Sequence, residues 1–236
     1  MRIGILKCGQ SPEALRAEHG DYDDMFRRLL ANREFDFDSY HVESMVFPGD
    51  VHDADGWLIT GSRHGVYEDH AFIPPLTDFI RRAHDAGVPI VGICFGHQIV
   101  AQALGGRVER FAGGWAVGPQ EYDFSGQAVT LNAWHQDQVV GLPPGAEVVG
   151  ANAFCSNAAL IYGDRAFTVQ AHPEFSDAFI DGLIEHRGSA VPQALIEGAR
   201  QQRGSARPDS LADRIEAFFR QPRAGMPAAA SPEGAA

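Results

Sequence analysis

The sequence predicts an α/β fold in which a mostly parallel central sheet is flanked by helices. Two observations lead to this prediction. Between residues 1 and 104, short apolar segments of strand type alternate with amphipathic segments of helical periodicity. In addition, residues 88–98, VPIVGICFGHQ, join a buried-strand run, a tight Gly-x-Cys-x-Gly turn and the start of a helix without a gap.

The expected elements follow one another in a regular order. Strands are expected over residues 3–6, 35–42, 57–59, 88–93 and 167–170. Helices are expected over residues 22–30, 74–87, 97–104, from about 176, and over 191–200 and 209–220. Pro74 and Pro75 open the second of these helices, because proline fits the first turn of a helix.

Between about residues 105 and 140 the pattern changes to short apolar segments separated by glycines. We expect these segments to form a small antiparallel insertion on one side of the sheet. Residues 1–220 are expected to form a single domain. The Pro-, Ala- and Gly-rich residues 221–236 are expected to be a disordered tail.

The composition limits the classes of function. The chain has 19 Lys and Arg against 31 Asp and Glu, a net charge of −12, which argues against nucleic acid or an anionic membrane as partner. Cysteines 8, 94 and 155 show no CxxC spacing, so neither a disulfide framework nor a zinc site is suggested. The N-terminus does not resemble a secretory signal, and no segment approaches the roughly 18 apolar residues of a membrane span. A cytoplasmic location is expected.

The turn at Cys94 is interpreted as a nucleophile elbow. Gly92 and Gly96 flank Cys94 at two positions on either side, and they allow a sharp backbone reversal that a side chain would obstruct. The following helix presents unpaired amides and its positive dipole end to the sulfur, which favours the reactive thiolate. The alternative is a buried structural cysteine, and the two glycines favour the reactive interpretation.

His172 and Glu174 supply what a cysteine nucleophile needs for acyl transfer, a base and a group that orients the base. They follow the strand expected at 167–170. Because the carboxyl ends of parallel strands meet at one sheet edge, His172 can reach Cys94. A single histidine is more often a surface or core residue. Its pairing with the elbow predicts a catalytic role.

The motif GICFGHQ followed by LGG, together with AHPEF downstream, resembles the class I glutamine amidotransferase family over about residues 1–187. The resemblance implies the flavodoxin-like fold of this family and a Cys-His-Glu triad. In that triad Cys94 is the nucleophile, His172 the general base and then acid, and Glu174 its orienting partner.

The resemblance also implies roles for backbone groups and for one glutamine. Backbone amides at Phe95 and around Gly61 and Ser62 would hold the oxyanion. Gln98 would help to hold the substrate. The alternatives are a plain strand-to-loop turn at Gly61 and Ser62, and a solvent-facing polar residue at Gln98.

Residues 133–139, AWHQDQV, occupy the place where the GMP synthetase branch of the family has a Ser-His-Gly-Asp segment that contacts the substrate. His135 and Asp137 match this segment, whereas Trp134 stands at the serine position. We expect Trp134 and His135 to bind substrate. Together with GGWAVG around Trp115, the segment resembles stand-alone members such as γ-glutamyl peptidases. Trp115 and Trp134 are equally compatible with a core role.

The implied reaction is hydrolysis of a γ-glutamyl amide, such as glutamine to glutamate and ammonia, through a γ-glutamyl thioester. No cofactor or metal is expected, because the ten histidines show no ligand spacing such as HExxH. No nucleotide-binding signature appears. Three interpretations follow: an amidotransferase whose ammonia-accepting synthase is a separate chain, a free-standing γ-glutamyl hydrolase, or a binding protein with a silent elbow. The presence of both His172 and Glu174 argues against the third.

Overall fold

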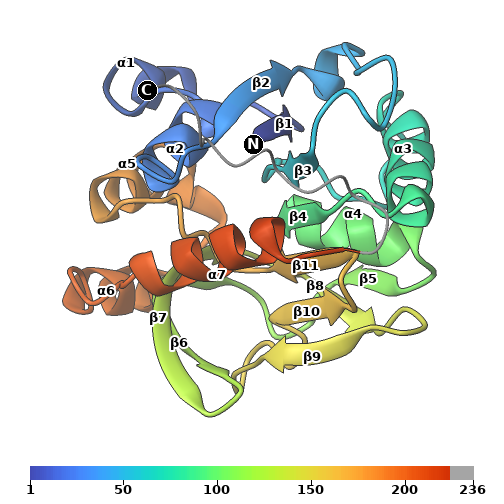
Figure 1. Cartoon of the computed structure of the whole chain (residues 1–236). Helices are drawn as coiled ribbons and strands as arrows, with labels where there is room; N and C mark the ends of the chain where they lie inside the picture. The colour runs from blue at the N-terminus through green and yellow to red at the C-terminus, as the bar shows by residue number, and fades with distance from the viewer. Residues whose placement is uncertain (224–236) are drawn as a thin grey trace, which may run out of the picture.

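The computed structural model describes residues 1–223 and places a seven-stranded sheet at the centre of the chain (Figure 1). In spatial order, its strands are β2 (Asp36–Tyr40), β1 (Arg2–Leu6), β3 (Gly56–Ile59), β4 (Ile90–Ile93), β11 (Ala166–Val169), β10 (Ala159–Tyr162) and β9 (Glu147–Gly150). The first five strands run parallel. Strand β10 pairs antiparallel with β11, and β9 pairs antiparallel with β10. The predicted mostly parallel α/β sheet is therefore confirmed.

Helices of the described residues cover both faces of the sheet or pack beside it, against the insertion. They are α1 (Glu13–His19), α2 (Tyr22–Leu29), α3 (Ile73–Ala86), α4 (Phe95–Ala103), α5 (Asp177–Arg187), α6 (Gln193–Gln201) and α7 (Asp209–Arg220), with short 3₁₀ turns at Val42–Ser44 and Gly188–Ala190. Helices α3 and α4 pack on one face, while α2 and α7 pack on the other (Figure 1).

Side chains of the central strands alternate between these two faces, as the pleat of a strand requires. Ile5 and Leu58 belong to the core beneath α2 and α7, whereas their neighbours Leu6 and Ile59 belong to the core beneath α3 and α4. A strand buried on both faces carries few polar residues. This explains why the parallel strands appear in the sequence as continuous apolar runs.

The antiparallel insertion is also confirmed. Strand β5 (Arg107–Arg110) pairs with β8 (Asp137–Gly141), and β6 (Ala116–Phe124) pairs with β7 (Gln127–His135) in a long hairpin. A bridge between Asn132 and His172 ties this hairpin to the segment that follows β11. The insertion thereby brings the end of β7 to the carboxyl edge of the main sheet.

Three elements were missed by the sequence prediction. Strands β9 and β10 have four residues each, too few to show an alternating pattern. Helix α1 has seven residues, of which Leu15 alone is buried, so it lacks an apolar stripe. The strand predicted over 35–42 ends at Tyr40 and continues into the 3₁₀ turn.

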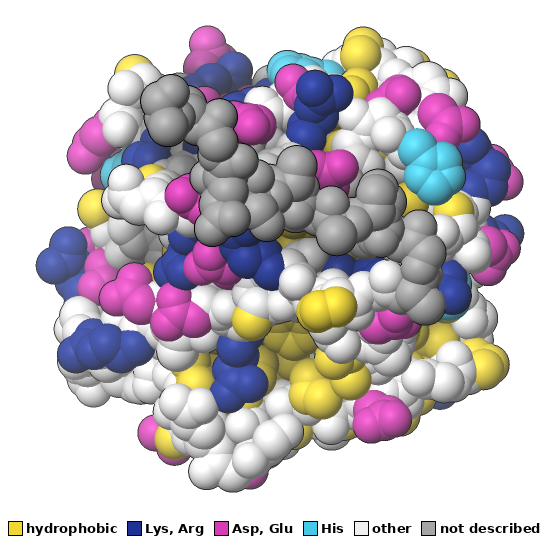
Figure 2. Space-filling model, viewed as in Figure 1, with side chains coloured by type: hydrophobic (Ala, Val, Ile, Leu, Met, Phe, Trp, Pro, Cys, Tyr) yellow, Lys and Arg dark blue, Asp and Glu magenta, His cyan; other side chains and the backbone are white. Residues whose placement is uncertain are grey.

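The predicted tail at 221–236 lies outside the described residues from position 224 onward. At its start, Arg223 is buried and donates hydrogen bonds to the carbonyl oxygens of Asp164, Phe218 and Phe219. In residues 1–223, none of the helices combines the length and the apolar character needed to cross a membrane. Figure 2 shows intermingled acidic and basic side chains on one face, with hydrophobic side chains gathered over β9 and β10, where Val148 is exposed.

Candidate active site

Cys94 lies at the junction between β4 and α4, in a strained backbone conformation. Its φ of 52° and ψ of −102° fall in a region that residues other than glycine rarely occupy. A Cβ atom on Gly92 would lie 2.5 Å from the Gly96 carbonyl oxygen, and one on Gly96 would lie 2.3 Å from the Ile59 carbonyl oxygen. Both positions must therefore be glycine for the backbone to turn here and present the Cys94 sulfur.

His172 is fixed in orientation from three directions. Its Nδ1 lies 2.7 Å from Oε1 of Glu174, and its ring stacks on Phe175 with centroids 3.8 Å apart and planes 4° apart. Its backbone amide donates to the carbonyl oxygen of Asn132 at 2.7 Å. An imidazole held in this way presents Nε2, the nitrogen on the far side of the ring from Glu174.

The protonation of His172 depends on its charged neighbours. Burial by itself would lower the pKa of this imidazole, but the charges of Glu174 and Cys94 and their hydrogen bonds raise it to about 10. At neutral pH His172 therefore carries a proton that it can pass to a leaving group.

Gln98, His135 and Asp137 form a second cluster of polar residues. Gln98 is 3% exposed, and its Nε2 donates to the Asp137 carbonyl oxygen at 3.0 Å and to Oε1 of Gln170 at 3.1 Å. His135 Nδ1 lies 3.2 Å from the same carbonyl oxygen. Burial and the charge on His172 lower the pKa of His135 to about 3, so its imidazole is neutral.

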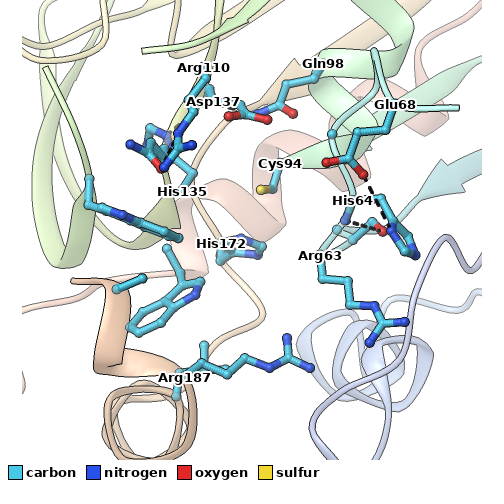
Figure 3. A pocket seen from close by; sticks show the side chains of 18 of the residues that line it. Arg63, His64, Glu68, Cys94, Gln98, Arg110, His135, Asp137, His172 and Arg187 are labelled. Atoms are coloured by element: carbon cyan, nitrogen blue, oxygen red, sulfur yellow. Dashed lines mark hydrogen bonds and ion pairs between the residues drawn. The ribbon is translucent and has the colours of Figure 1, made fainter. Parts of the chain in front are cut away.

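These side chains surround one cavity of about 400 Å³ (Figure 3). Of the residues proposed from the sequence, the cavity is lined by Gly61, Ser62, Cys94, Gln98, Trp134, His135 and His172. Glu174 lies behind His172 and outside the cavity wall. Phe95 contributes its side chain to the core, so its backbone amide is the group available to a substrate.

The three backbone amides proposed to hold the oxyanion lie in two different places, the turn after β3 and the start of α4. Within residues 1–223, the amides of Gly61 and Ser62 donate to no protein acceptor. Phe95 is the first residue of α4, a position whose amide has no acceptor inside the helix. A Cβ atom on Gly61 would lie 3.0 Å from Cε1 of His172 and 3.9 Å from Cβ of Cys94, which places this turn beside both side chains.

The two tryptophans whose role the sequence left undecided both line the cavity. Trp115 and Trp134 form a tilted pair with ring centroids 6.0 Å apart. They also pack against the buried cluster that contains Phe175 and Phe179. The pair thus serves as cavity wall on one side and as core on the other.

Sequence reasoning missed several residues around the site. Tyr22, Arg63 and Arg187 line the cavity, and each comes from a different part of the chain with no motif to mark it. Phe175, which stacks on His172, could have been identified from the sequence, because it is the last residue of the AHPEF motif.

A cluster of possible metal ligands includes two residues that line this cavity, His64 and Glu68. His64, Glu68 and His70 bring their ligand atoms within 4.8 Å of one another. Their ion pairs already account for these side chains: His70 Nε2 lies 2.8 Å from Glu68 Oε2, and His64 Nε2 lies 3.0 Å from Glu43 Oε1. The sequence HGVYEDH gave no recognised ligand spacing.

A family model described as glutamine amidotransferase class-I matches residues 21–181, which include Cys94, His172 and Glu174. The chain belongs to this family. Solved structures named as glutamine amidotransferases share its fold: one from Methylobacillus flagellatus has a TM-score of 0.73 at 19% identity over 92% of both chains. Another, from Thermotoga maritima, has a TM-score of 0.72 at 20% identity over 94% of this chain and 99% of the other. The predicted family and its fold are confirmed.

Curated relatives in the family include γ-glutamyl peptidases, putative glutamine amidotransferases and GMP synthases. γ-Glutamyl peptidase 4 of Arabidopsis thaliana is 30% identical over 191 residues, 73% of this chain and 75% of the relative. The glutamine-hydrolysing GMP synthase of Thermus thermophilus is 33% identical over 175 residues, 65% of this chain but 32% of the synthase. Family and relatives indicate an enzyme of the class I glutamine amidotransferase or γ-glutamyl hydrolase type.

Proposed function

We propose that this protein hydrolyses the γ-amide bond of a γ-glutamyl substrate with Cys94, His172 and Glu174 as its catalytic triad. The observation that carries the proposal is the placement of three groups at one sheet edge. A strained cysteine lies at the end of β4, and in the same cavity a histidine is held 2.7 Å from a buried carboxylate. Nucleophile, base and orienting group are the parts that cysteine-dependent acyl transfer requires.

In the first half of the reaction, the Cys94 thiolate attacks the γ-carbonyl carbon and forms a carbon–sulfur bond. The carbonyl electron pair moves onto oxygen and gives a tetrahedral oxyanion. His172 then donates its proton to the amide nitrogen, the carbon–nitrogen bond breaks, and ammonia or an amine leaves. A γ-glutamyl thioester remains on Cys94.

In the second half, neutral His172 takes a proton from water, which attacks the thioester carbonyl. The carbon–sulfur bond breaks, glutamate leaves, and the thiolate and imidazolium are restored. Glu174 keeps the imidazole in one orientation and stabilises its charged form in both halves.

Backbone amides are proposed to stabilise the oxyanion. Gly61 and Ser62 line the cavity, and their amides donate to no acceptor within the described residues. Phe95 follows Cys94 directly, and its amide has no acceptor inside α4. Loss of one such donor costs on the order of 100- to 1000-fold in rate.

Gln98, Trp134 and His135 are proposed to bind the glutamyl part of the substrate. Gln98 and neutral His135 are fixed by hydrogen bonds to the Asp137 carbonyl oxygen, so their remaining polar atoms are pre-oriented. Trp134 supplies an apolar wall for the methylene groups.

A free-standing γ-glutamyl hydrolase is favoured over a subunit that supplies ammonia to a separate synthase. The γ-glutamyl peptidase relative is 30% identical over 73% of this chain and 75% of its own length. We propose that residues 1–220 act as a single catalytic domain. The amidotransferase alternative rests on the family and on the GMP synthase relatives.

The experiment that tests this proposal is glutamate release by the purified protein alone, with glutamine and with a series of γ-glutamyl peptides. Cys94→Ala should abolish turnover, whereas Cys155→Ala, which removes a buried thiol outside the triad, should retain it. Turnover by Cys94→Ala would overturn the nucleophile assignment. Weak turnover of glutamine alone would favour the subunit alternative, and no turnover of any substrate would favour a non-catalytic protein.

A further inference from the structure

Two arginines lie on one side of the candidate catalytic residues. In Figure 3, Arg63 and Arg187 lie on the opposite side of Cys94 and His172 from Gln98, Arg110 and Asp137. Arg63 follows the turn after β3, and Arg187 is the last residue of α5. Their guanidinium groups extend toward one another.

Neither guanidinium has a carboxylate partner. Among the ion pairs formed within residues 1–223, none involves Arg63 or Arg187. Arg63 also donates no hydrogen bond to another described residue. Arg187 interacts with the Tyr22 hydroxyl through its charge and a hydrogen bond, so its partner is a neutral group. In a chain with 31 acidic and 19 basic residues, two such arginines at a cavity wall are available to an anionic ligand.

A second cavity of about 450 Å³ continues from this side of the site. It shares Arg63 and Arg187 with the catalytic cavity and is also lined by Arg16 from α1. Its two carboxylates have other roles. Glu43 pairs with His64 at 3.0 Å, and Glu13 lies in the first turn of α1, where the helix dipole favours an acidic side chain.

The opposite half of the catalytic cavity differs in charge. There Arg110 and Asp137 lie across from each other in the β5–β8 pair, so this half offers one cation and one anion. A glutamyl group carries an ammonium and a carboxylate, and it suits this half. The half that contains Arg63 and Arg187 offers cations and more space. It suits the leaving group, which lies beyond the scissile bond.

We propose that Arg63 and Arg187 form a subsite for the leaving group, and that this subsite selects γ-glutamyl peptides whose leaving amine bears a carboxylate. The inference rests on the proposed γ-glutamyl hydrolysis and specifies its substrate class. Guanidinium groups bind carboxylates through paired N–H donors, which gives both affinity and geometric selection. Arg63 and Arg187 are specificity residues in this account, and neither takes part in the bond changes.

The test compares two substrates that differ in a single charge, γ-glutamylglycine and γ-glutamylglycinamide. The measured quantity is the ratio of their kcat/KM values. We expect wild type to favour γ-glutamylglycine by at least about tenfold, as for a charge-assisted hydrogen bond at a partly exposed site. Arg63→Gln and Arg187→Gln should each lower this ratio by about three- to tenfold. Arg200→Gln, which removes an exposed arginine on α6, should leave it unchanged.

The outcomes separate this inference from the proposed function. If wild type hydrolyses both substrates at equal kcat/KM, γ-glutamyl hydrolysis stands and the subsite does not exist. If the preference survives in both variants, or falls equally in Arg200→Gln, the assignment to Arg63 and Arg187 is wrong. If wild type cleaves no γ-glutamyl substrate, the proposed function itself fails.

Discussion

Replacing Gly96 by alanine tests the steric origin of the elbow. In most helices this change is favourable by up to about 1 kcal/mol, because glycine loses more backbone freedom on folding. At Gly96 the new Cβ would lie 2.3 Å from the Ile59 carbonyl oxygen, about 1 Å inside ordinary contact. This carbonyl oxygen belongs to the backbone of β3, which lies in the middle of the sheet, so it has little room to move.

Overpacking by one methyl group costs about 1–3 kcal/mol, and a backbone obstacle favours the upper part of this range. The gain of up to about 1 kcal/mol from replacing a helical glycine offsets part of this cost, so we expect Gly96→Ala to lower the free energy of unfolding by about 2 kcal/mol. Because the first turn of α4 must move, Cys94 should also shift, and a displacement of about 1 Å can reduce kcat/KM roughly 100-fold.

Urea unfolding and glutamate release measure the two effects. The matched control is Gly198→Ala in α6, where nothing lies within 4 Å of the new Cβ. This control should raise the free energy of unfolding by about 0.5–1 kcal/mol and leave kcat/KM unchanged. Wild-type stability and activity in Gly96→Ala would refute the steric argument.

Two further predictions concern the reacting groups. Glu174→Gln should lower kcat/KM by about 100- to 10,000-fold. It should also move the alkaline limb of the pH profile of kcat/KM to lower pH, because burial then lowers the pKa of His172 without an opposing carboxylate. If the alkaline limb does not shift, Glu174 does not raise the pKa of His172. Iodoacetamide at neutral pH should alkylate Cys94 in the native protein but not Cys8 or Cys155, since burial raises the pKa of both thiols. Peptide mapping that finds the label on Cys8 or Cys155 would contradict this prediction.

The sequence was most informative where local sterics decide the structure. The elbow was predictable because Gly92, Cys94 and Gly96 lie within five residues, and their spacing directly determines whether the backbone can turn. The parallel sheet was predictable for a similar reason, because burial on both faces leaves continuous apolar runs along the chain.

Features that depend on contacts between distant segments were not predictable. Arg63 and Arg187 meet at one cavity, although they come from a loop after β3 and from the end of α5. The β9–β10 hairpin joins the sheet through pairing with β11, and its four-residue strands show no pattern of their own. The position of Trp115 and Trp134, between cavity and core, likewise follows from tertiary packing.

The central claim is that hydrolysis passes through a γ-glutamyl thioester on Cys94, and nucleophile partitioning tests it most directly. Hydroxylamine added during turnover competes with water for the thioester and gives a γ-glutamyl hydroxamate. If all substrates share one acyl intermediate, the ratio of hydroxamate to glutamate should be the same for γ-glutamyl substrates with different leaving groups. A ratio that changes with the leaving group, or turnover with no hydroxamate, would contradict the proposed mechanism.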